Sequence, residues 1–313
     1  MAVAGHHQQV SYVIRRALTG ELDLKDSPVR QFFEARFGSG LRDVQTSYRA
    51  AAGPMLVPGV PPAEANAGTI GTAADWLMRF LVYPTPSLEL AAAGAGLCKM
   101  LPALRAIAEQ LGYSGMGADT FTGPVAGSAV ERDVLHRSCW ALALLSEVYR
   151  GGPMIAEIGP IGRLPDRSAK ALLAAAPQAG LGQLAELRTV MESALLPALA
   201  SRPGLWAPGP TLAGSALMKG DCDLIAGGLL LELKVSAKPI SLPAIELWQL
   251  LGYALMDYVD EFGISEVARF AGRYGYLAVW DLSQLLEDLA GYTVSLAEVR
   301  AEFRELLEAC QPN

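Results

Sequence analysis

The chain has 313 residues, of which 51% are hydrophobic, and this composition predicts a compact fold with a sizeable core in one or two domains. No uncharged apolar run approaches the ~18–20 residues of a membrane-spanning helix, and the chain does not open with a basic segment followed by an apolar one. The four cysteines are too widely spaced for a zinc site. We therefore expect a cytoplasmic protein with no membrane segment. The net charge of −7 argues against a general nucleic-acid coat, although an acidic nuclease can gain positive charge locally from bound metal ions.

The first part of the chain, residues 1–167, is predicted to be mainly helical. Ser27 and Pro28 mark the start of a helix over residues 28–37, because serine caps helices and proline fits their first turn. Thr72 is expected to cap a helix that runs through Leu81, and further helices are expected over residues 88–111 and 131–149. Nothing in this region matches a known domain, so its role is left open.

The second part, residues 168–313, is predicted to mix helices and strands in one α/β domain. Short apolar runs between turn residues predict strands, and longer runs with apolar residues at helical spacing predict helices. In chain order we expect a helix over 181–199, a turn at 203–210, strands over 211–218, 222–226 and 229–235, a helix over 243–262, strands over 267–271 and 276–280, and a helix over 296–309.

A predicted hairpin within this domain holds the residues of most chemical interest. Two glycines at positions 227–228 separate two apolar runs, and glycine accepts the positive φ that a two-residue hairpin turn needs. With that turn, Asp223 is expected to face Glu232 and Asp221 is expected to face Lys234. Side chains alternate across a strand, so these four should point from one face, while Cys222, Leu224, Leu229, Leu231 and Leu233 point from the other face into the core.

Two carboxylates held opposite each other repel and favour a cation between them. Mg²⁺ suits such a pair because it takes hard oxygen ligands, and Mn²⁺ is its usual substitute. Lys234 follows on the same predicted face, where a cation can stabilise charge that develops on a phosphate. The alternative is a solvated face with an Asp221–Lys234 ion pair, and the hairpin alone does not choose between the two.

These residues resemble the PD-(D/E)XK nuclease superfamily, whose signature is an acidic residue on one strand and (D/E)-x-K on the next. Here the signature would be Asp223 and Glu232-Leu233-Lys234. Gln249-Leu250-Leu251-Gly252-Tyr253 matches the Q-x-x-x-Y motif of the RecB-like branch on the following helix, where i and i+4 lie on one helical face. The resemblance covers about residues 181–282. It implies a restriction-endonuclease-like core, a mixed sheet flanked by helices.

The resemblance also implies roles for these side chains. Asp223 and Glu232 would hold Mg²⁺, Lys234 would activate water or stabilise the transition state, and Gln249 and Tyr253 would lie at the edge of the active site. The family usually adds a metal-binding Glu from the preceding helix. The candidates are Glu186 and Glu192, of which Glu186 is favoured because Glu192 has Arg188 as an i,i+4 partner.

Two arginines near the fourth predicted strand are candidate substrate contacts. Arg269 and Arg273 carry the bidentate donors that suit phosphate oxygens. Exposed charges at the edge of the sheet explain them equally well, and Lys219 and Lys238 near the hairpin have the same status.

The expected function is therefore metal-dependent hydrolysis of phosphodiester bonds, in DNA first and RNA second, in restriction, phage defence or repair. The alternative is a nuclease-fold protein with little or no catalysis that binds nucleic acid or another protein. The acidic composition favours this alternative mildly, and an unbroken Asp–Glu–Lys set favours the enzyme.

Overall fold

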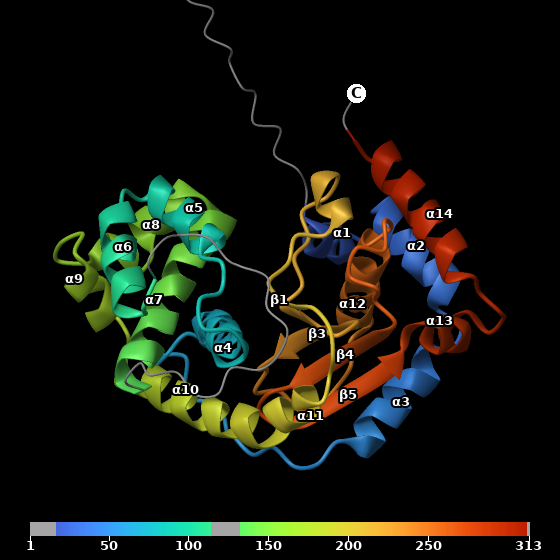
Figure 1. Ribbon diagram of the computed structural model, residues 1–313, viewed down its shortest axis with the longest axis horizontal. Helices are drawn as coiled ribbons and strands as arrows, with labels where there is room; N and C mark the ends of the chain where they lie inside the picture. The colour runs from blue at the N-terminus through green and yellow to red at the C-terminus, as the bar shows by residue number, and fades with distance from the viewer. Residues whose placement is uncertain (1–16, 114–131, 312–313) are drawn as a thin grey trace, which may run out of the picture.

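The computed structural model describes residues 17–113 and 132–311, and the expectation of no leader therefore concerns residues outside it. A five-stranded sheet lies in the middle of the molecule and helices cover both of its faces (Figure 1). Within the described residues, no helix combines the length and apolar character needed to cross a bilayer.

The sheet is mixed, as expected for an α/β fold. Its strands lie side by side in chain order, with β3 and β4 parallel and the other neighbours antiparallel. The parallel pair needs a crossover, and helix α12 (Ala244–Met256) supplies it. The strands are β1 (Trp206–Pro208), β2 (Leu224–Ala226), β3 (Leu229–Lys234), β4 (Glu266–Ala271) and β5 (Tyr276–Asp281).

The first strand is not the one that the sequence predicted. Residues 211–218 contain the 3₁₀ helix η3 (Ala213–Ala216), and β1 lies instead in the segment expected to be a turn. The residues of η3 are small, without the β-branched alternation of a strand. Gly214 also packs tightly against α12, since a Cβ placed there would lie 2.7 Å from Cβ of Met256.

The helix predicted over 243–262 is shorter than expected, because it ends at Met256. The next residue, Asp257, accepts hydrogen bonds from the backbone N–H groups of Glu261 and Phe262 through its carboxylate. A side chain that satisfies the backbone in this way stabilises a turn in place of further helix.

The helices of the first part begin where capping residues allow. Ser27 accepts a hydrogen bond from Val29 N at 3.2 Å and starts α2 (Pro28–Phe37), which confirms that prediction. Helix α4 (Ala67–Val82) is capped by Asn66, which accepts from Thr69 N at 3.0 Å. The expected cap at Thr72 was therefore wrong, because Asn66, a stronger capping residue, starts the helix six residues earlier.

The helix expected over 88–111 is two helices, since Lys99 at φ 59° breaks the chain between α5 (Glu89–Leu97) and α6 (Leu101–Gln110). The helix expected over 131–149 is α7 (Arg132–Gly151), whose predicted first residue lies outside the described part. The remaining helices before α10 are α1 (Leu18–Asp23), α3 (Leu41–Ala51), α8 (Pro153–Ile158), η1 (Ile161–Arg163) and α9 (Ala169–Ala174).

The helix predicted over 181–199 contains a π turn. Helix α10 (Gln178–Val190) leads through η2 (Met191–Leu195) into α11 (Leu196–Ala200). Pro197 lies just after the π turn, and a proline without an N–H removes one of the regular helical hydrogen bonds. The chain closes with α13 (Leu282–Ala290), which was not predicted, and α14 (Leu296–Ala309), which confirms the prediction.

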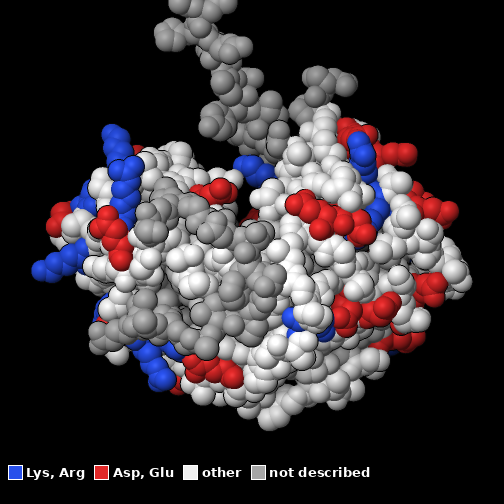
Figure 2. Space-filling view, in the orientation of Figure 1, with Lys and Arg blue, Asp and Glu red and all other residues white. Residues whose placement is uncertain are grey.

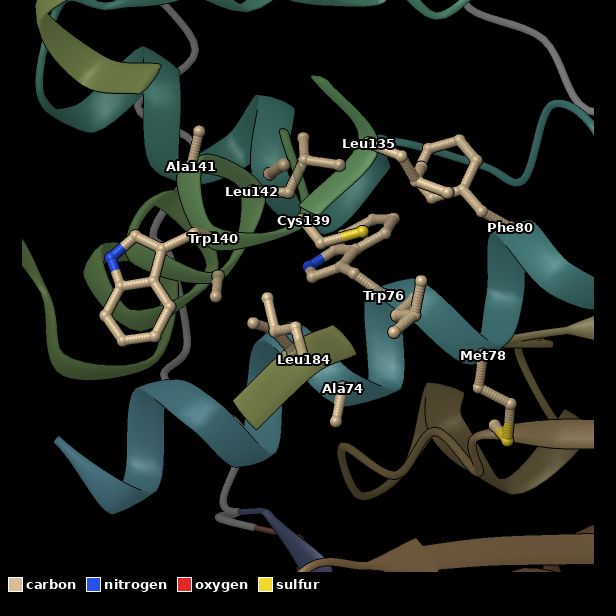
Figure 3. Packing of buried hydrophobic residues seen from close by; sticks show 14 of the residues in the cluster. Ala74, Trp76, Met78, Phe80, Leu135, Cys139, Trp140, Ala141, Leu142 and Leu184 are labelled. Carbon is tan, nitrogen blue, oxygen red and sulfur yellow. The ribbon is translucent and has the colours of Figure 1, made fainter. Parts of the chain in front are cut away.

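Two hydrophobic cores lie on opposite faces of the sheet. The first contains Leu224, Leu229, Leu231 and Leu233 of the hairpin together with α4, α7 and α10. Figure 3 shows part of it, where Trp76 of α4 lies against Cys139 of α7 and near Leu184 of α10. Truncating one such leucine to alanine costs about 2–5 kcal/mol.

The second core joins the other face of the sheet to α12, α13 and α14. It contains Ile225 and Leu230 of the hairpin and also Cys222. The expected position of Cys222 beside Leu224 was therefore wrong, since the chain bends at Asp223 and the strand alternation stops there. Both faces of the hairpin are buried.

The N-terminal helices divide between these two cores. Residues of α1 and α2 pack in the second core with α12–α14, whereas α4–α9 pack in the first. The predicted division at residues 1–167 and 168–313 stays a prediction, and each core draws on both parts of the chain.

Candidate active site

The predicted hairpin forms with the predicted register. Leu224 pairs with Leu231 and Ala226 pairs with Leu229. Gly227 and Gly228 form the turn with φ of 54° and 79°, the two positive values that a type I′ turn requires. The turn therefore fixes which residues of β3 lie opposite the segment that carries Asp223.

Asp223 lies just before β2 and turns its carboxylate toward β3. Its Oδ2 atom accepts a hydrogen bond from Leu233 N at 2.8 Å, and its backbone oxygen accepts one from Gly209 N at 2.9 Å. Asp221 does not face Lys234 as expected. It forms an isolated bridge with Thr211, because the chain has already left the hairpin ladder.

Glu232 is buried at the centre of the site, with 5% of its surface exposed. Its Oε1 atom accepts hydrogen bonds from Lys234 Nζ at 2.8 Å and from Gln249 Nε2 at 2.9 Å. Its Oε2 atom is buried with no hydrogen-bond donor among the described residues. A buried acceptor without a partner costs about 1–3 kcal/mol, and more when it is charged.

Helix α12 supplies the next layer of the site. Gln249 accepts from Lys234 Nζ at 3.1 Å through Oε1, and its Nε2 atom donates to the hydroxyl oxygen of Tyr253 at 2.9 Å. The two side chains lie on one face of α12 because they are one helical turn apart. The structure thus brings Glu232, Lys234, Gln249 and Tyr253 into one hydrogen-bonded network, with Asp223 beside it.

A second buried pair comes from α4, which the sequence analysis did not include in the site. Arg79 Nε donates to both carboxylate oxygens of Asp75, at 3.0 and 3.1 Å, and Arg79 is only 3% exposed. Its guanidinium lies against Gly209, the residue that donates to Asp223, and a Cβ on Gly209 would lie 1.8 Å from Nη1. The available signal was an i,i+4 acid–arginine pair inside an otherwise apolar helix.

Burial and charge repulsion act together on the carboxylates. Burial, followed by repulsion from Glu232 and Asp75, holds the pKa of Asp223 well above its ordinary value, although Arg79 and Lys234 oppose the shift. Burial also raises the pKa of Glu232, against the opposing effect of Lys234. Asp75, Asp223 and Glu232, with Asp221 nearby, therefore outnumber the two cations, and this imbalance favours either a proton or an added cation.

Lys234 remains a cation in this setting. Burial alone would lower its pKa, but Glu232 and Asp223 outweigh burial and raise the pKa above its ordinary value. The ammonium group is therefore charged at neutral pH, as a group that stabilises an anion must be.

The two glutamates expected to complete the metal site lie elsewhere on α10 and η2. Glu186 is exposed and accepts from Gln183 Nε2 at 3.2 Å. Glu192 pairs with Arg188 at 2.6 Å, as its spacing indicated. The third carboxylate that raises the pKa of both Asp223 and Glu232 is Asp75, from α4.

The two candidate substrate arginines are buried, so their interpretation as exposed edge charges was wrong. Arg269 lies beside Glu232 in the sheet register, but its guanidinium pairs with Glu246 and donates to the Tyr48 hydroxyl. Arg273 donates to the backbone oxygens of Val57 and Pro58 in the loop after α3 and to that of Val235 just after β3. Its guanidinium therefore links these two segments. Arg273 therefore has a structural role here, and only Arg269 adjoins the hollow that Lys234 lines.

Carboxylate oxygens are the donors that Mg²⁺ prefers, and the partnerless Oε2 of Glu232 is the atom that most needs a cation. Within residues 17–113 and 132–311, no three acidic, histidine or cysteine side chains are already placed to hold a metal ion together. The carboxylates of Asp223 and Glu232 are chemically suited to bind a cation. For Asp75 to join them as a ligand, it would have to give up part of its contact with Arg79.

Comparisons with protein families, with curated proteins and with solved structures found no match for this chain.

Proposed function

We propose that the protein is a metal-dependent nuclease that hydrolyses phosphodiester bonds in DNA, with RNA as the second candidate substrate. The observation that carries this proposal is the buried Oε2 atom of Glu232, an acceptor with no described donor in a site where carboxylates outnumber cations. A site that served stability alone would gain from replacing such a group with an apolar one.

The proposed roles follow from the contacts. Asp223 and Glu232 would hold Mg²⁺, and Asp75 takes the place that the sequence analysis gave to Glu186 or Glu192. Bound Mg²⁺ would polarise a phosphoryl oxygen and lower the pKa of a coordinated water. Lys234, held by Glu232 and Gln249, would stabilise negative charge on the phosphate.

Gln249 has a positioning role in this proposal. It touches Glu232, Lys234 and the Tyr253 hydroxyl, and it is buried on α12. Residues that orient metal ligands in this way commonly change metal affinity by about 10–100-fold when they are removed.

The test is cleavage of labelled single-stranded DNA, double-stranded DNA and RNA with Mg²⁺, with Mn²⁺ and with EDTA. Glu232→Gln and Lys234→Met are expected to slow cleavage by about 100-fold or more, as is usual when a group that stabilises transition-state charge is lost. Glu109→Gln and Lys170→Met are matched controls, because they change exposed side chains of the same types. Cleavage in EDTA, or equal cleavage by all four variants, would count against the proposal.

A binding module without catalysis is the second candidate. It is favoured by the net charge of −7 and by the lack of a preformed three-ligand group among the described residues. Calorimetry together with the cleavage assay separates the two candidates, since both would bind metal or nucleic acid but a binding module would cleave none of the three substrates.

A further inference from the structure

A hollow of about 370 Å³ lies next to the candidate active site, between the helices of the first core and the segment that leads into β2. Its lining includes Arg79, Leu90, Ala93, Tyr149, Lys219 and Asp221. Figure 2 shows a depression near the top of the view, between the left and right sides of the molecule, with atoms of both acidic and basic residues at its rim. Of these six residues, Arg79 pairs with Asp75 and Asp221 bridges to Thr211, while the other four have no part in the carboxylate site.

Two cations line the hollow. Arg79 is buried and fixed by Asp75, and its Nη1 atom is directed toward Gly209, which also lines the hollow. The Nζ atom of Lys219 lies over the Tyr149 ring, 5.4 Å from its centre, in a cation–π contact that a base stacking on that face would replace. The backbone of Lys219 is held in place, because its carbonyl oxygen accepts from Leu18 N at 2.8 Å.

The rest of the lining suits a base and a sugar. Tyr149 offers an aromatic ring, and Leu90 and Ala93 of α5 add apolar surface. Two acids, Glu89 and Asp221, also line the hollow, so the cations do not outnumber the acids. A phosphate alone should therefore bind weakly, and stacking on the ring, which contributes about 1–3 kcal/mol per base, is needed for affinity.

The position of the hollow relates it to the reaction. Gly209 lines it and donates its backbone N–H to the backbone oxygen of Asp223 at 2.9 Å, which places the hollow at the edge of the carboxylate site. A second hollow of about 140 Å³ contains Lys234 and Lys238. Hollows of these sizes hold single small groups, and a base can enter one only when it is unpaired and out of the base stack.

We propose that the larger hollow binds one unpaired nucleotide of single-stranded DNA, next to the phosphate that lies at Glu232 and Lys234. Lys219 and Arg79 contact its phosphate, and its base stacks on Tyr149 against Leu90 and Ala93. This inference rests on the proposed nuclease function and adds a strand preference to it.

The experiment measures binding of a fluorescent twelve-residue oligothymidylate by anisotropy in EDTA, where cleavage does not interfere. Tyr149→Ala and Lys219→Ala are expected to weaken binding at least fivefold, and Tyr149→Phe, which keeps the ring, should bind like wild type. Lys170→Ala is the matched charge control, since Lys170 is exposed on α9. Thermal melting of each variant confirms that the fold is kept.

A duplex that carries the same thymidylate strand should compete at least tenfold more weakly than the single strand. Equal competition by the duplex, or wild-type affinity in both Tyr149→Ala and Lys219→Ala, would overturn the inference. Because binding is measured without turnover, the binding result can be interpreted even if the protein cleaves none of the substrates. If wild type cleaves DNA while these variants bind normally, the strand preference fails and the nuclease proposal stands.

Discussion

Gln249 and Glu232 are joined across the interface between α12 and β3 by a hydrogen bond of 2.9 Å from Nε2 to Oε1. The same glutamine accepts from Lys234 and donates to Tyr253, so one amide orients a carboxylate, an ammonium group and a hydroxyl. The other carboxylate oxygen of Glu232, Oε2, has no donor among the described residues.

Replacing Gln249 should therefore disturb the site without removing a proposed metal ligand. Gln249→Ala is expected to raise the Mg²⁺ concentration for half-maximal cleavage by about 10-fold, because Glu232 loses one of its two donors and gains freedom to rotate. Tyr253→Phe removes only the hydroxyl and should have a smaller effect. A Mg²⁺ titration of cleavage measures both, and an unchanged midpoint in Gln249→Ala would contradict the positioning role.

Variants of Asp75 and of Glu186 test which of the two residues is the third metal ligand. Asp75→Asn is expected to weaken Mg²⁺ binding about 10-fold, because it removes a carboxylate that acts on both Asp223 and Glu232. Glu186→Gln changes an exposed side chain of α10 and should leave binding unchanged. Calorimetric titration with Mg²⁺ or Mn²⁺ distinguishes the two, and the reverse result would return the role to Glu186.

Stability without metal should fall as the pH rises. Folding raises the pKa of Asp223 and of Glu232 above the ordinary values of 3.8 and 4.5, so the folded state holds protons that the unfolded chain releases. Such groups stabilise the fold fully below their unfolded pKa values, and this contribution is lost as the pH rises through the folded values.

Mg²⁺ should reverse that trend, because it binds the deprotonated ligands. Its effect on the melting temperature is expected to be small near about pH 5 and to grow toward about pH 8. The double variant Asp223→Asn/Glu232→Gln should show neither the pH trend nor the Mg²⁺ effect. Equal stabilisation by Mg²⁺ at both pH values would contradict the coupling of protons to metal.

Gly209 should be intolerant of any side chain. Its φ is 62°, which costs an alanine about 1–2 kcal/mol, and an added Cβ would also displace the guanidinium of Arg79. Gly263 is the matched control, since it has φ 56° and open space around its Cβ position. Chemical denaturation should show Gly209→Ala to be the more destabilised variant. Equal losses would mean that Arg79 moves aside freely.

The sequence by itself determined the local arrangement of the hairpin and of α12. Two glycines at 227–228 fixed the turn and the register, and strand alternation then placed Glu232 and Lys234 on one face. The i,i+4 spacing of Gln249 and Tyr253 likewise set them on one side of a helix. These features follow from backbone geometry over a few residues, so spacing alone predicts them.

Only the tertiary structure decided what the rest of the chain brings to the site. It placed Asp75 and Arg79 of α4 beside Asp223, left Glu186 exposed, and buried Arg273 among backbone oxygens. Spacing cannot supply such contacts, because they join segments far apart in the chain and depend on how two cores pack against the same sheet.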